Sequence, residues 1–246
     1  MALQGEISLL ILFVGMVLSA ALTFYFAIKI LRATAGSNKG WLFYGLFGIA
    51  NAINSFAGIA RSIVSGETAN NFVLVIQSLL MLGLTVFLVL ALTILAEVFG
   101  IKSKVFSRNN ILIATGIALV GLIVYANSFA MASVYSITSI TFGIGLFLTV
   151  PTIWKIMTKT GQLPWKFLFA SHIIAMIAIY LIFGAVGCCS GAITENCPNL
   201  TSNEYLQIPA PCSPFFVGGY TAFLIVLMVS TFLQAGAFYI INKRLN

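Results

Sequence analysis

The chain has 246 residues, of which 61% are hydrophobic and 7% are charged, and its mean hydropathy is +1.09. Soluble domains carry about a quarter charged residues, so this composition excludes a water-soluble surface and predicts an all-α integral membrane protein. The net charge of +7 is interpreted as basic anchors at the membrane edge rather than as a nucleic-acid surface. The chain has no Asp and a single His, His172, which excludes a Ser-His-Asp triad, an aspartyl dyad and bis-histidine haem ligation.

Apolar runs bounded by charged residues, Gly, Pro or Asn predict a bundle of seven transmembrane helices. In chain order they cover approximately residues 7–31, 41–64, 72–99, 111–126, 133–157, 165–187 and 215–241. These runs and short connections fill the chain, so we expect one transmembrane domain over residues 1–246 and no separate soluble domain. The first run is about 25 residues long and has no basic segment before it, unlike a cleaved signal peptide.

The distribution of basic residues sets the orientation of these helices. With seven crossings, every Lys and Arg except Arg61 falls on one side of the membrane. Four acids fall on the same side as Arg61, namely Glu6, Glu67, Glu195 and Glu204. Because basic residues concentrate in cytoplasmic loops, we predict a cell-membrane protein with its N-terminus outside and its C-terminus in the cytoplasm.

The most regular pattern lies in the second predicted helix, where small and polar residues recur on one face. This face comprises Gly45, Gly48, Asn51, Ser55, Gly58 and Ser62. Since small and polar residues allow close helix contact in lipid, we interpret the face as a packing seam inside the bundle. The alternatives are a small polar cavity faced by Asn51, Asn54 and Ser55, or a seam between two molecules.

Uncharged polar residues in other helices belong to the same hypothesis. Gln77 in the third helix and Gln234 in the seventh each need a partner inside the bundle. In the fifth helix, Ser136 and Ser139 precede Pro151. Because Pro151 removes a backbone hydrogen bond, it predicts a helix kink.

Ionisable side chains are nearly absent from the predicted spans, which disfavours proton or ion coupling through carboxylates. His172 is interpreted as a hydrogen-bonded packing residue, and Glu97 as an acid at the membrane interface. The sequence has no nucleophile–base pair with recognisable spacing, no Gly-rich phosphate loop and no metal-ligand cluster in the membrane. We therefore expect no catalytic residues, no metal and no cofactor.

All four cysteines lie between the last two predicted helices, in residues 188–214. The predicted topology places this loop outside, where disulfides persist. Adjacent cysteines pair only with strain, which leaves Cys188–Cys197 with Cys189–Cys212, or Cys188–Cys212 with Cys189–Cys197. A four-cysteine metal site is the alternative, but the C-x-x-C spacing is absent. Asn199 begins a glycosylation sequon. Such a loop is either merely ordered by its disulfides or recognises a partner or ligand.

Two segments of the chain resemble each other. Residues 29–34 and 155–160 share Lys, Ile and Thr at matching positions, and Trp41 and Trp165 open the helices that follow. This pattern predicts a parallel repeat of two three-helix units joined by the 111–126 helix. In size, topology and the placement of Pro151 the chain resembles the sugar-facilitating SWEET family. It departs from that family because the first helix lacks a matching proline and the Pro-Gln signature is absent.

Two functions follow from these observations. The preferred one is a non-catalytic accessory or sensor-like subunit. The short cytoplasmic connections are too small for an effector domain, so such a subunit would act through contacts with other membrane proteins. Its expected partners are the lipid bilayer and other membrane-protein subunits, and not nucleic acid. The alternative is a SWEET-like facilitative transporter or channel for a small uncharged solute. It predicts a central water-accessible cavity touching Asn51, Ser55, Gln77 and Ser139, whereas a tightly packed bundle opposes it.

Overall fold

A computed structural model describes residues 2–34, 39–63, 67–101, 131–192 and 213–245. The described residues are helical apart from short turns, and they form α1 (Ala2–Thr34), α2 (Lys39–Ile63), α3 (Glu67–Val98), α5 (Met131–Thr160), α6 (Leu163–Ala192) and α7 (Ser213–Leu245). Within this part of the chain, five helices are long and apolar enough to cross a membrane, and α6 adds a shorter apolar stretch, Leu163–Ala178. The prediction of an all-helical membrane bundle is therefore confirmed.

The observed helices follow the predicted ones in order, with ends that differ by a few residues. The largest differences, five residues each, are at the starts of α1 and α3 and at the end of α6, which continues to Ala192. Cys188 and Cys189 therefore lie in α6 rather than in a loop beginning at residue 188, because no proline interrupts the helical hydrogen bonds before Ala192. Outside the described residues lie the predicted 111–126 helix, Cys197, Asn199 and Cys212.

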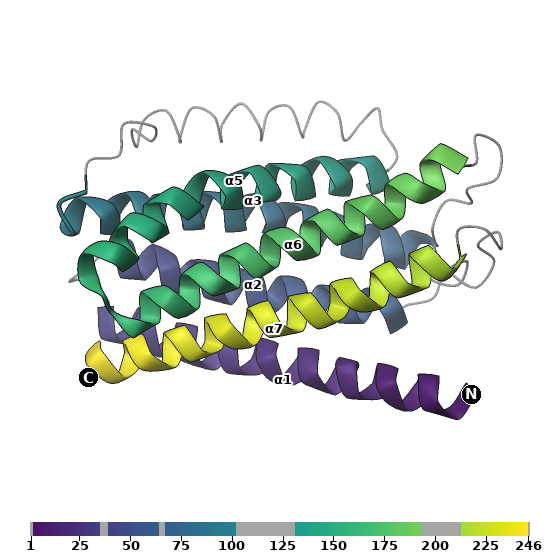
Figure 1. Ribbon diagram of the computed structural model, residues 1–246, viewed down its shortest axis with the longest axis horizontal. Coiled ribbons are helices and arrows are strands. Elements are labelled where there is room, and N and C mark those ends of the chain that lie inside the picture. The colour runs from purple at the N-terminus through teal and green to yellow at the C-terminus, as the bar shows by residue number, and fades with distance from the viewer. Residues whose placement is uncertain (1, 35–38, 64–66, 102–130, 193–212, 246) are drawn as a thin grey trace.

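The six described helices form a closed ring. Each packs along two neighbours, in the order α1, α2, α3, α5, α6, α7 and back to α1. In Figure 1, α1, α3, α5 and α7 end at the left, where α2 and α6 begin. Contacts between helices that are not neighbours in this ring must therefore cross its interior.

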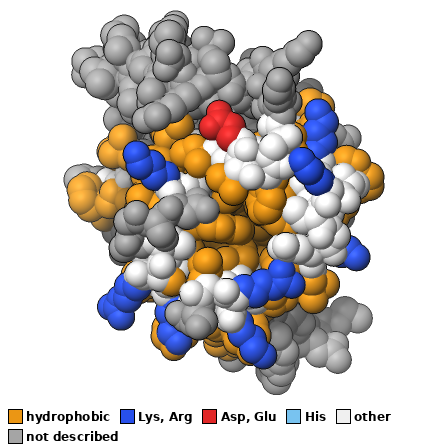
Figure 2. All heavy atoms as spheres, turned by 90° about the vertical axis from the view of Figure 1, so that its left-hand side faces the viewer, with side chains coloured by type: hydrophobic (Ala, Val, Ile, Leu, Met, Phe, Trp, Pro, Cys, Tyr) orange, Lys and Arg blue, Asp and Glu red, His pale blue; other side chains and the backbone are white. Residues whose placement is uncertain are grey.

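Basic side chains gather where α1, α3, α5 and α7 end. This basic end carries Lys29, Arg32, Lys39, Lys155, Lys159, Lys166, Lys243 and Arg244. Figure 2 views the bundle from this side and shows Lys and Arg side chains around a central apolar surface. Among the described side chains, the one acid is Glu97, which is exposed in the last turn of α3.

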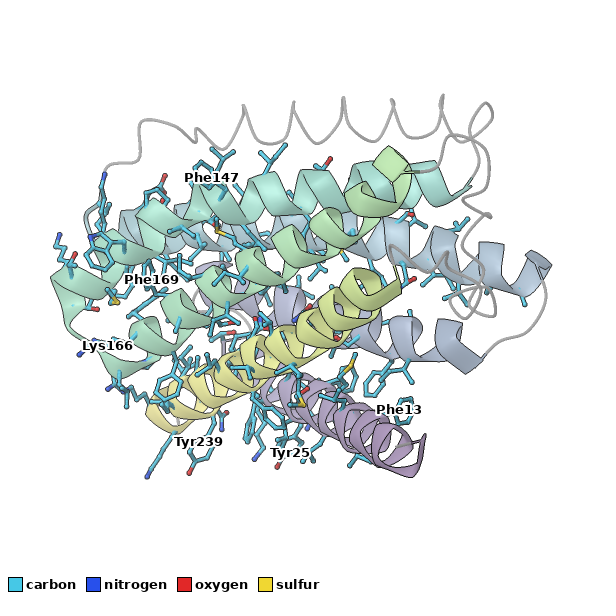
Figure 3. All side chains as sticks on the ribbon, turned by 45° about the vertical axis from the view of Figure 1, so that its right-hand side comes forward. Phe13, Tyr25, Phe147, Lys166, Phe169 and Tyr239 are labelled. Carbon is cyan, nitrogen blue, oxygen red and sulfur yellow. The ribbon has the colours of Figure 1, made fainter. Side chains whose placement is uncertain are left out.

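The outer surface of the ring is apolar and aromatic. Phe13, Tyr25, Phe147 and Tyr239 point away from the bundle (Figure 3), and Phe147 is 64% exposed. Exposed apolar surface of this extent is unfavourable in water and suits contact with lipid. Tyr25 lies nearer the basic end, with the Nζ of Lys29 4.7 Å from its ring centroid. Aromatic and basic residues commonly anchor helices at the membrane interface in this way.

Local capping fixes the basic ends of α3 and α5. Gly100 adopts a φ of +65°, and the Ile101 N–H donates to the Ala96 carbonyl at 2.8 Å, as in a Schellman motif. The Nζ of Lys159 donates to the carbonyl of Phe99 at 2.5 Å. This hydrogen bond satisfies a carbonyl beyond the last turn of α3 and joins the end of α5 to it.

Small residues bring α2 close to α1 and α7. A Cβ built on Gly48 would lie 2.2 Å from Cε2 of Phe238 and 2.9 Å from the Cβ of Ala27. One built on Gly45 would lie 2.9 Å from the Leu31 side chain. Only glycine allows this approach without displacing neighbours. The part of the small-residue face nearest the basic end, at Gly45 and Gly48, therefore contacts side chains of α1 and α7.

Candidate functional site

Five aromatic side chains close the interior of the ring at the basic end. This aromatic plug consists of Trp41, Tyr44, Phe99, Trp165 and Phe238. The ring centroids of Trp41 and Trp165 are 5.5 Å apart, and Phe99 meets Trp165 edge to face at 5.6 Å. These contacts join α2 to α6 and α3 to α6, which are not neighbours in the ring. The plug therefore spans the interior.

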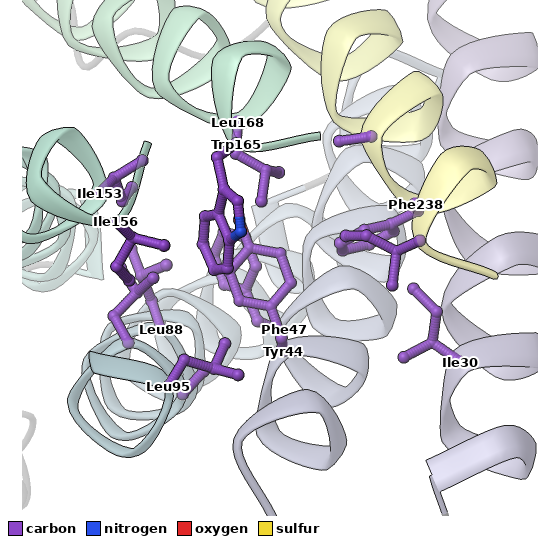
Figure 4. Close-up of a cluster of buried hydrophobic side chains, with 14 of the residues drawn as sticks. Ile30, Tyr44, Phe47, Leu88, Leu95, Ile153, Ile156, Trp165, Leu168 and Phe238 are labelled. Atoms are coloured by element: carbon purple, nitrogen blue, oxygen red, sulfur yellow. The ribbon is translucent and has the colours of Figure 1, made fainter. Parts of the chain in front are cut away.

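The plug is held by apolar side chains from the surrounding helices. Figure 4 shows Trp165 beside Tyr44 and Phe47, with Phe238 and Ile30 on one side of them. On the other side lie Leu88, Leu95, Ile153 and Ile156, all fully buried. Trp165 is 1% exposed. Such close packing fixes the rotamers of the plug residues.

Beyond the plug, the interior contains polar side chains. The Nδ2 of Asn51 on α2 donates to the Oε1 of Gln234 on α7 at 2.7 Å. The rings of Phe47 on α2 and His172 on α6 stack with centroids 6.2 Å apart. Neither α7 nor α6 adjoins α2 in the ring, so both contacts cross the interior. Gln234 and His172 are buried, and Asn51 is partly buried.

These polar groups lie at a common depth. Counted from the basic ends of their helices, Asn51 is 12 residues inside α2, Gln234 is 11 inside α7, and His172 is 9 inside α6. At the α-helical rise, the three positions are about 18, 17 and 14 Å from the basic end. A bilayer has a hydrocarbon core about 30 Å thick, so this layer is near mid-depth if the basic residues mark one interface.

Several polar atoms in this interior have no hydrogen-bond partner among the described residues. In this layer they are Nε2 of His172 and Nε2 of Gln234; Oδ1 of Asn54 belongs to a residue about one turn farther from the basic end than Asn51, and Oη of Tyr44 belongs to the plug itself. The Nδ1 of His172 lies 2.7 Å from the Leu168 carbonyl, and because a carbonyl only accepts, Nδ1 is the donor. In a neutral ring, Nε2 is then an acceptor. The layer thus presents both donors and acceptors, and buried polar groups of this kind require a partner such as water or a ligand.

Serine side chains join α6 to α7 beside this layer. Oγ of Ser171 donates to the Ser230 carbonyl, and Oγ of Ser230 donates to the Ser171 carbonyl, each at 2.9 Å. Ser171 precedes His172 directly, and Ser230 lies one turn from Gln234. The reciprocal bonds therefore fix the two interior side chains relative to each other.

The residues predicted for a polar cavity or packing seam have different positions. Asn51 and Asn54 carry interior polar atoms, whereas Oγ of Ser55 donates to the carbonyl of Asn51 in its own helix at 3.0 Å. Gln77 is buried on α3, and its Nε2 lies 3.4 Å from a Cβ built on Gly58. Gln77 and Gly58 therefore lie close together at the α2–α3 contact, farther from the basic end.

The structure does not test the predicted residues of α5 as part of this site. The backbone of α5 is one continuous helix through Pro151, which is exposed on the bundle. The kink at Pro151 stays a prediction. The side chains of Ser136 and Ser139 lie outside the described part of the structure.

Sequence reasoning did not single out several residues of the site. Tyr44 and Ser78, which carry unpartnered polar atoms, and the bonded pair Ser171 and Ser230 received no role. His172 was interpreted as a hydrogen-bonded packing residue, and its burial and the bond of its Nδ1 to Leu168 agree with this, but its unpartnered Nε2 was not predicted. One signal was present: Ser230 and Gln234 are one turn apart in an apolar helix. Such spacing places both on one face.

A hollow opens on the outer side of the plug, at the basic end. Its volume is about 200 Å³, and its walls are formed by Trp41, Phe99, Gln162, Pro164, Trp165, Ile241, Arg244 and Leu245. These residues come from the starts of α2 and α6, the segment before α6, and the ends of α3 and α7. The hollow therefore lies over the bundle interior rather than on its lipid-facing side, in agreement with the apolar centre of Figure 2.

Across the described residues, no three or more His, Cys, Asp or Glu side chains gather in a way that fits a metal ion. Comparison of the chain with protein-family models, with curated proteins and with solved structures finds no match.

Proposed function

We propose that the protein mediates the passive movement of a small, uncharged solute with hydroxyl or amide groups through the interior of the helix ring. The observation that carries the proposal is the pair of unpartnered polar atoms at mid-depth, Nε2 of His172 and Nε2 of Gln234, with the unpartnered Oδ1 of Asn54 about one turn farther along α2. In lipid, an unsatisfied polar group is unfavourable by several kcal/mol. These atoms have no solvent-accessible surface in the described, closed bundle, so we propose that water or solute reaches them only when the interior opens.

The chemistry of the layer favours a neutral solute. Its polar side chains are amides, hydroxyls and an imidazole, and none of the described Lys, Arg or Glu side chains lies at this depth. A fixed ionic partner for a charged solute is therefore lacking among the described residues. A molecule with both donors and acceptors can replace the water that Gln234 Nε2 and His172 Nε2 otherwise need.

The proposed topology has seven crossings, with the basic end in the cytoplasm. In support, α3 ends at the basic end and α5 begins at the other end of the bundle (Figure 1). The 29 residues between them, 102–130, include the apolar run 111–126, and about 20 residues suffice to cross a bilayer. Cytoplasmic placement of the basic end then follows from the positive-inside rule.

A two-fold relation between α1–α3 and α5–α7 supports the same function. Exchanging the two sets leaves the order of helices in the ring unchanged. Thr34 Oγ1 donates to the Ile30 carbonyl at 2.7 Å, and at the matching positions Thr160 Oγ1 donates to the Ile156 carbonyl at 2.8 Å. Transporters built from such repeats bind solute near the membrane midplane, between the repeats.

The plug supplies a closure on the cytoplasmic side of this path. Trp41 and Trp165 occupy matching positions in the two repeats and meet at the centre of the ring. A small rotation of one repeat against the other separates them without unfolding a helix. The described state is therefore closed at the basic end, with the polar layer beyond the closure.

Transport by the purified protein tests the proposal. The full chain is reconstituted into phosphatidylcholine vesicles, and the entry of glycerol and of urea is followed by stopped-flow light scattering. We expect faster entry of at least one solute than in protein-free vesicles, and a loss of this increase in Asn51→Leu and Gln234→Met. Thr85→Val is the matched control, because Thr85 Oγ1 bonds the Met81 carbonyl of its own helix at 3.0 Å.

Two results would contradict the proposal. One is equal entry in vesicles with and without correctly folded protein. The other is an increase that survives both interior substitutions. The first result would favour the accessory-subunit hypothesis, which no described contact tests, and a stable partner should then co-purify from native membranes in mild detergent. The second result would place the path of the solute away from Asn51 and Gln234.

A further inference from the structure

We infer that the hollow at the basic end binds a single-ring organic anion and that this anion holds the aromatic plug closed. The binding is a property of the hollow itself, whereas its effect on solute passage rests on the proposed function. The inference begins from the lining of the hollow, which combines aromatic rings with one cationic side chain, Arg244, and has no acid among its described residues.

The apolar part of the ligand follows from the floor of the hollow. Trp41 and Phe99 line it, and Trp165, which is 1% exposed, packs against both of their rings. Pro164 and Ile241 complete the apolar walls. Planar aromatic molecules pack favourably on such rings. Sites for drug-sized ligands measure roughly 300–1,000 Å³. The volume of about 200 Å³ therefore suits a smaller molecule with one ring.

The charge of the ligand follows from the surroundings of the hollow. Arg244 is part of its wall, and a guanidinium group pairs with a carboxylate through two parallel hydrogen bonds. Lys39, Lys166 and Lys243 are exposed and close in sequence to the lining residues Trp41, Trp165 and Arg244. Their summed field raises the local concentration of anions. The hollow is thus complementary to a carboxylate attached to an apolar ring.

The position of the hollow favours a soluble anion over an acidic lipid. Its lining residues come from the basic ends of α2, α3, α6 and α7, which lie on different sides of the ring. It therefore opens along the bundle axis toward the aqueous phase. A ligand in it contacts Trp41 and Trp165 together, and these two residues must separate for the plug to open.

Tryptophan fluorescence provides a direct binding measurement. The chain has three tryptophans, so Trp154→Phe leaves only Trp41 and Trp165, both in the wall of the hollow. This variant is studied in phosphatidylcholine nanodiscs with 4-nitrobenzoate, whose nitroaromatic ring quenches tryptophan. 4-Nitrobenzyl alcohol is the neutral analogue, and acetate is the anion without a ring.

We expect saturable quenching by 4-nitrobenzoate, with weaker binding of the alcohol and no competition by acetate. Arg244→Gln should weaken binding by about two- to fivefold, the scale of an ion pair made by a solvent-exposed arginine. Arg244→Lys should have an intermediate affinity. Arg32→Gln is the matched control and should bind normally, because Arg32 is an exposed arginine of the basic end that does not line the hollow.

Equal losses in Arg244→Gln and Arg32→Gln would overturn the inference, because they would indicate a general effect of surface charge. Loss of binding when phosphatidylglycerol is added to the nanodiscs would also overturn it, since an acidic lipid would then be the occupant. In transporting vesicles, 4-nitrobenzoate should slow passage by the wild type and not by Arg244→Gln. Binding without slowing would refute closure of the plug but leave passage itself intact, whereas absence of passage before any anion is added would refute the proposed function.

Discussion

The hydrogen bond between Asn51 and Gln234 allows the interior of the ring to be tested by a double-mutant cycle. Asn51→Leu and Gln234→Met remove the amides while keeping side chains of similar size. Nε2 of Gln234 already has no partner among the described residues, so Asn51→Leu leaves this amide entirely unpaired in the structure. The corresponding loss for an unsatisfied buried group is about 1–3 kcal/mol.

The energy of the pair itself should be smaller than the effect of either single change. Interhelical hydrogen bonds in membrane proteins contribute on average about 0.6 kcal/mol, and at most about 1.7. We therefore expect each substitution to lower the free energy of unfolding by about 1–2 kcal/mol, and the double variant to lose less than the sum by about 0.6–1.7 kcal/mol.

Reversible unfolding by dodecyl sulfate in mixed micelles, followed by circular dichroism, measures the free energy of unfolding of the wild type, the two single variants and the double variant. Asn51→Leu combined with Thr160→Val is the control, because Oγ1 of Thr160 donates to the carbonyl of Ile156 in its own helix at 2.8 Å. This second pair should be additive. Additivity within about 0.3–0.5 kcal/mol for the Asn51 and Gln234 pair would refute a direct contact across the interior.

Three further predictions follow from close packing, backbone geometry and the plug. Gly48→Ala should lower the free energy of unfolding in the same assay by about 1–3 kcal/mol, because the added Cβ would overlap Phe238. Gly58→Ala is the control and should leave the free energy of unfolding unchanged, because the nearest side-chain atom would lie 3.4 Å from its Cβ. Equal losses in the two variants would refute the close approach at Gly48. Gly161→Ala should cost about 1–2 kcal/mol at a φ of +62°, and Gly161→Asn should recover part of it; no difference between them would refute the left-handed backbone as the cause. Trp41→Ala should raise the rate of solute entry in proteoliposomes by removing one half of the Trp41–Trp165 contact, and an unchanged or lower rate in a folded variant would refute the plug as a closure.

Much of the fold was predictable because helix formation depends on local sequence. Apolar runs of membrane-spanning length specify the helices, and Gly100 and Gly161 end two of them in the left-handed conformation. The resemblance between residues 29–34 and 155–160 is also a local signal, and the matched threonine hydrogen bonds follow it.

The candidate site was only partly predictable because it depends on which helix faces meet across the ring. The need of Gln77 and Gln234 for partners was evident from their depth, but nothing in the sequence specified Asn51 as the partner of Gln234, 183 residues away. The burial of His172 and the hydrogen bond of its Nδ1 to Leu168 agree with the predicted hydrogen-bonded packing residue, but the sequence could not show that its Nε2 has no partner among the described residues.

The sequence by itself determined the helices, the collection of basic residues at one end and the small-residue face of α2, since each is a property of a single segment. Only the tertiary structure decided the ring order, the meeting of Trp41 with Trp165, the polar layer and the hollow above the plug. The reason is that the rotation of each helix about its own axis is set by its neighbours, through contacts such as that of Gly48 with Phe238.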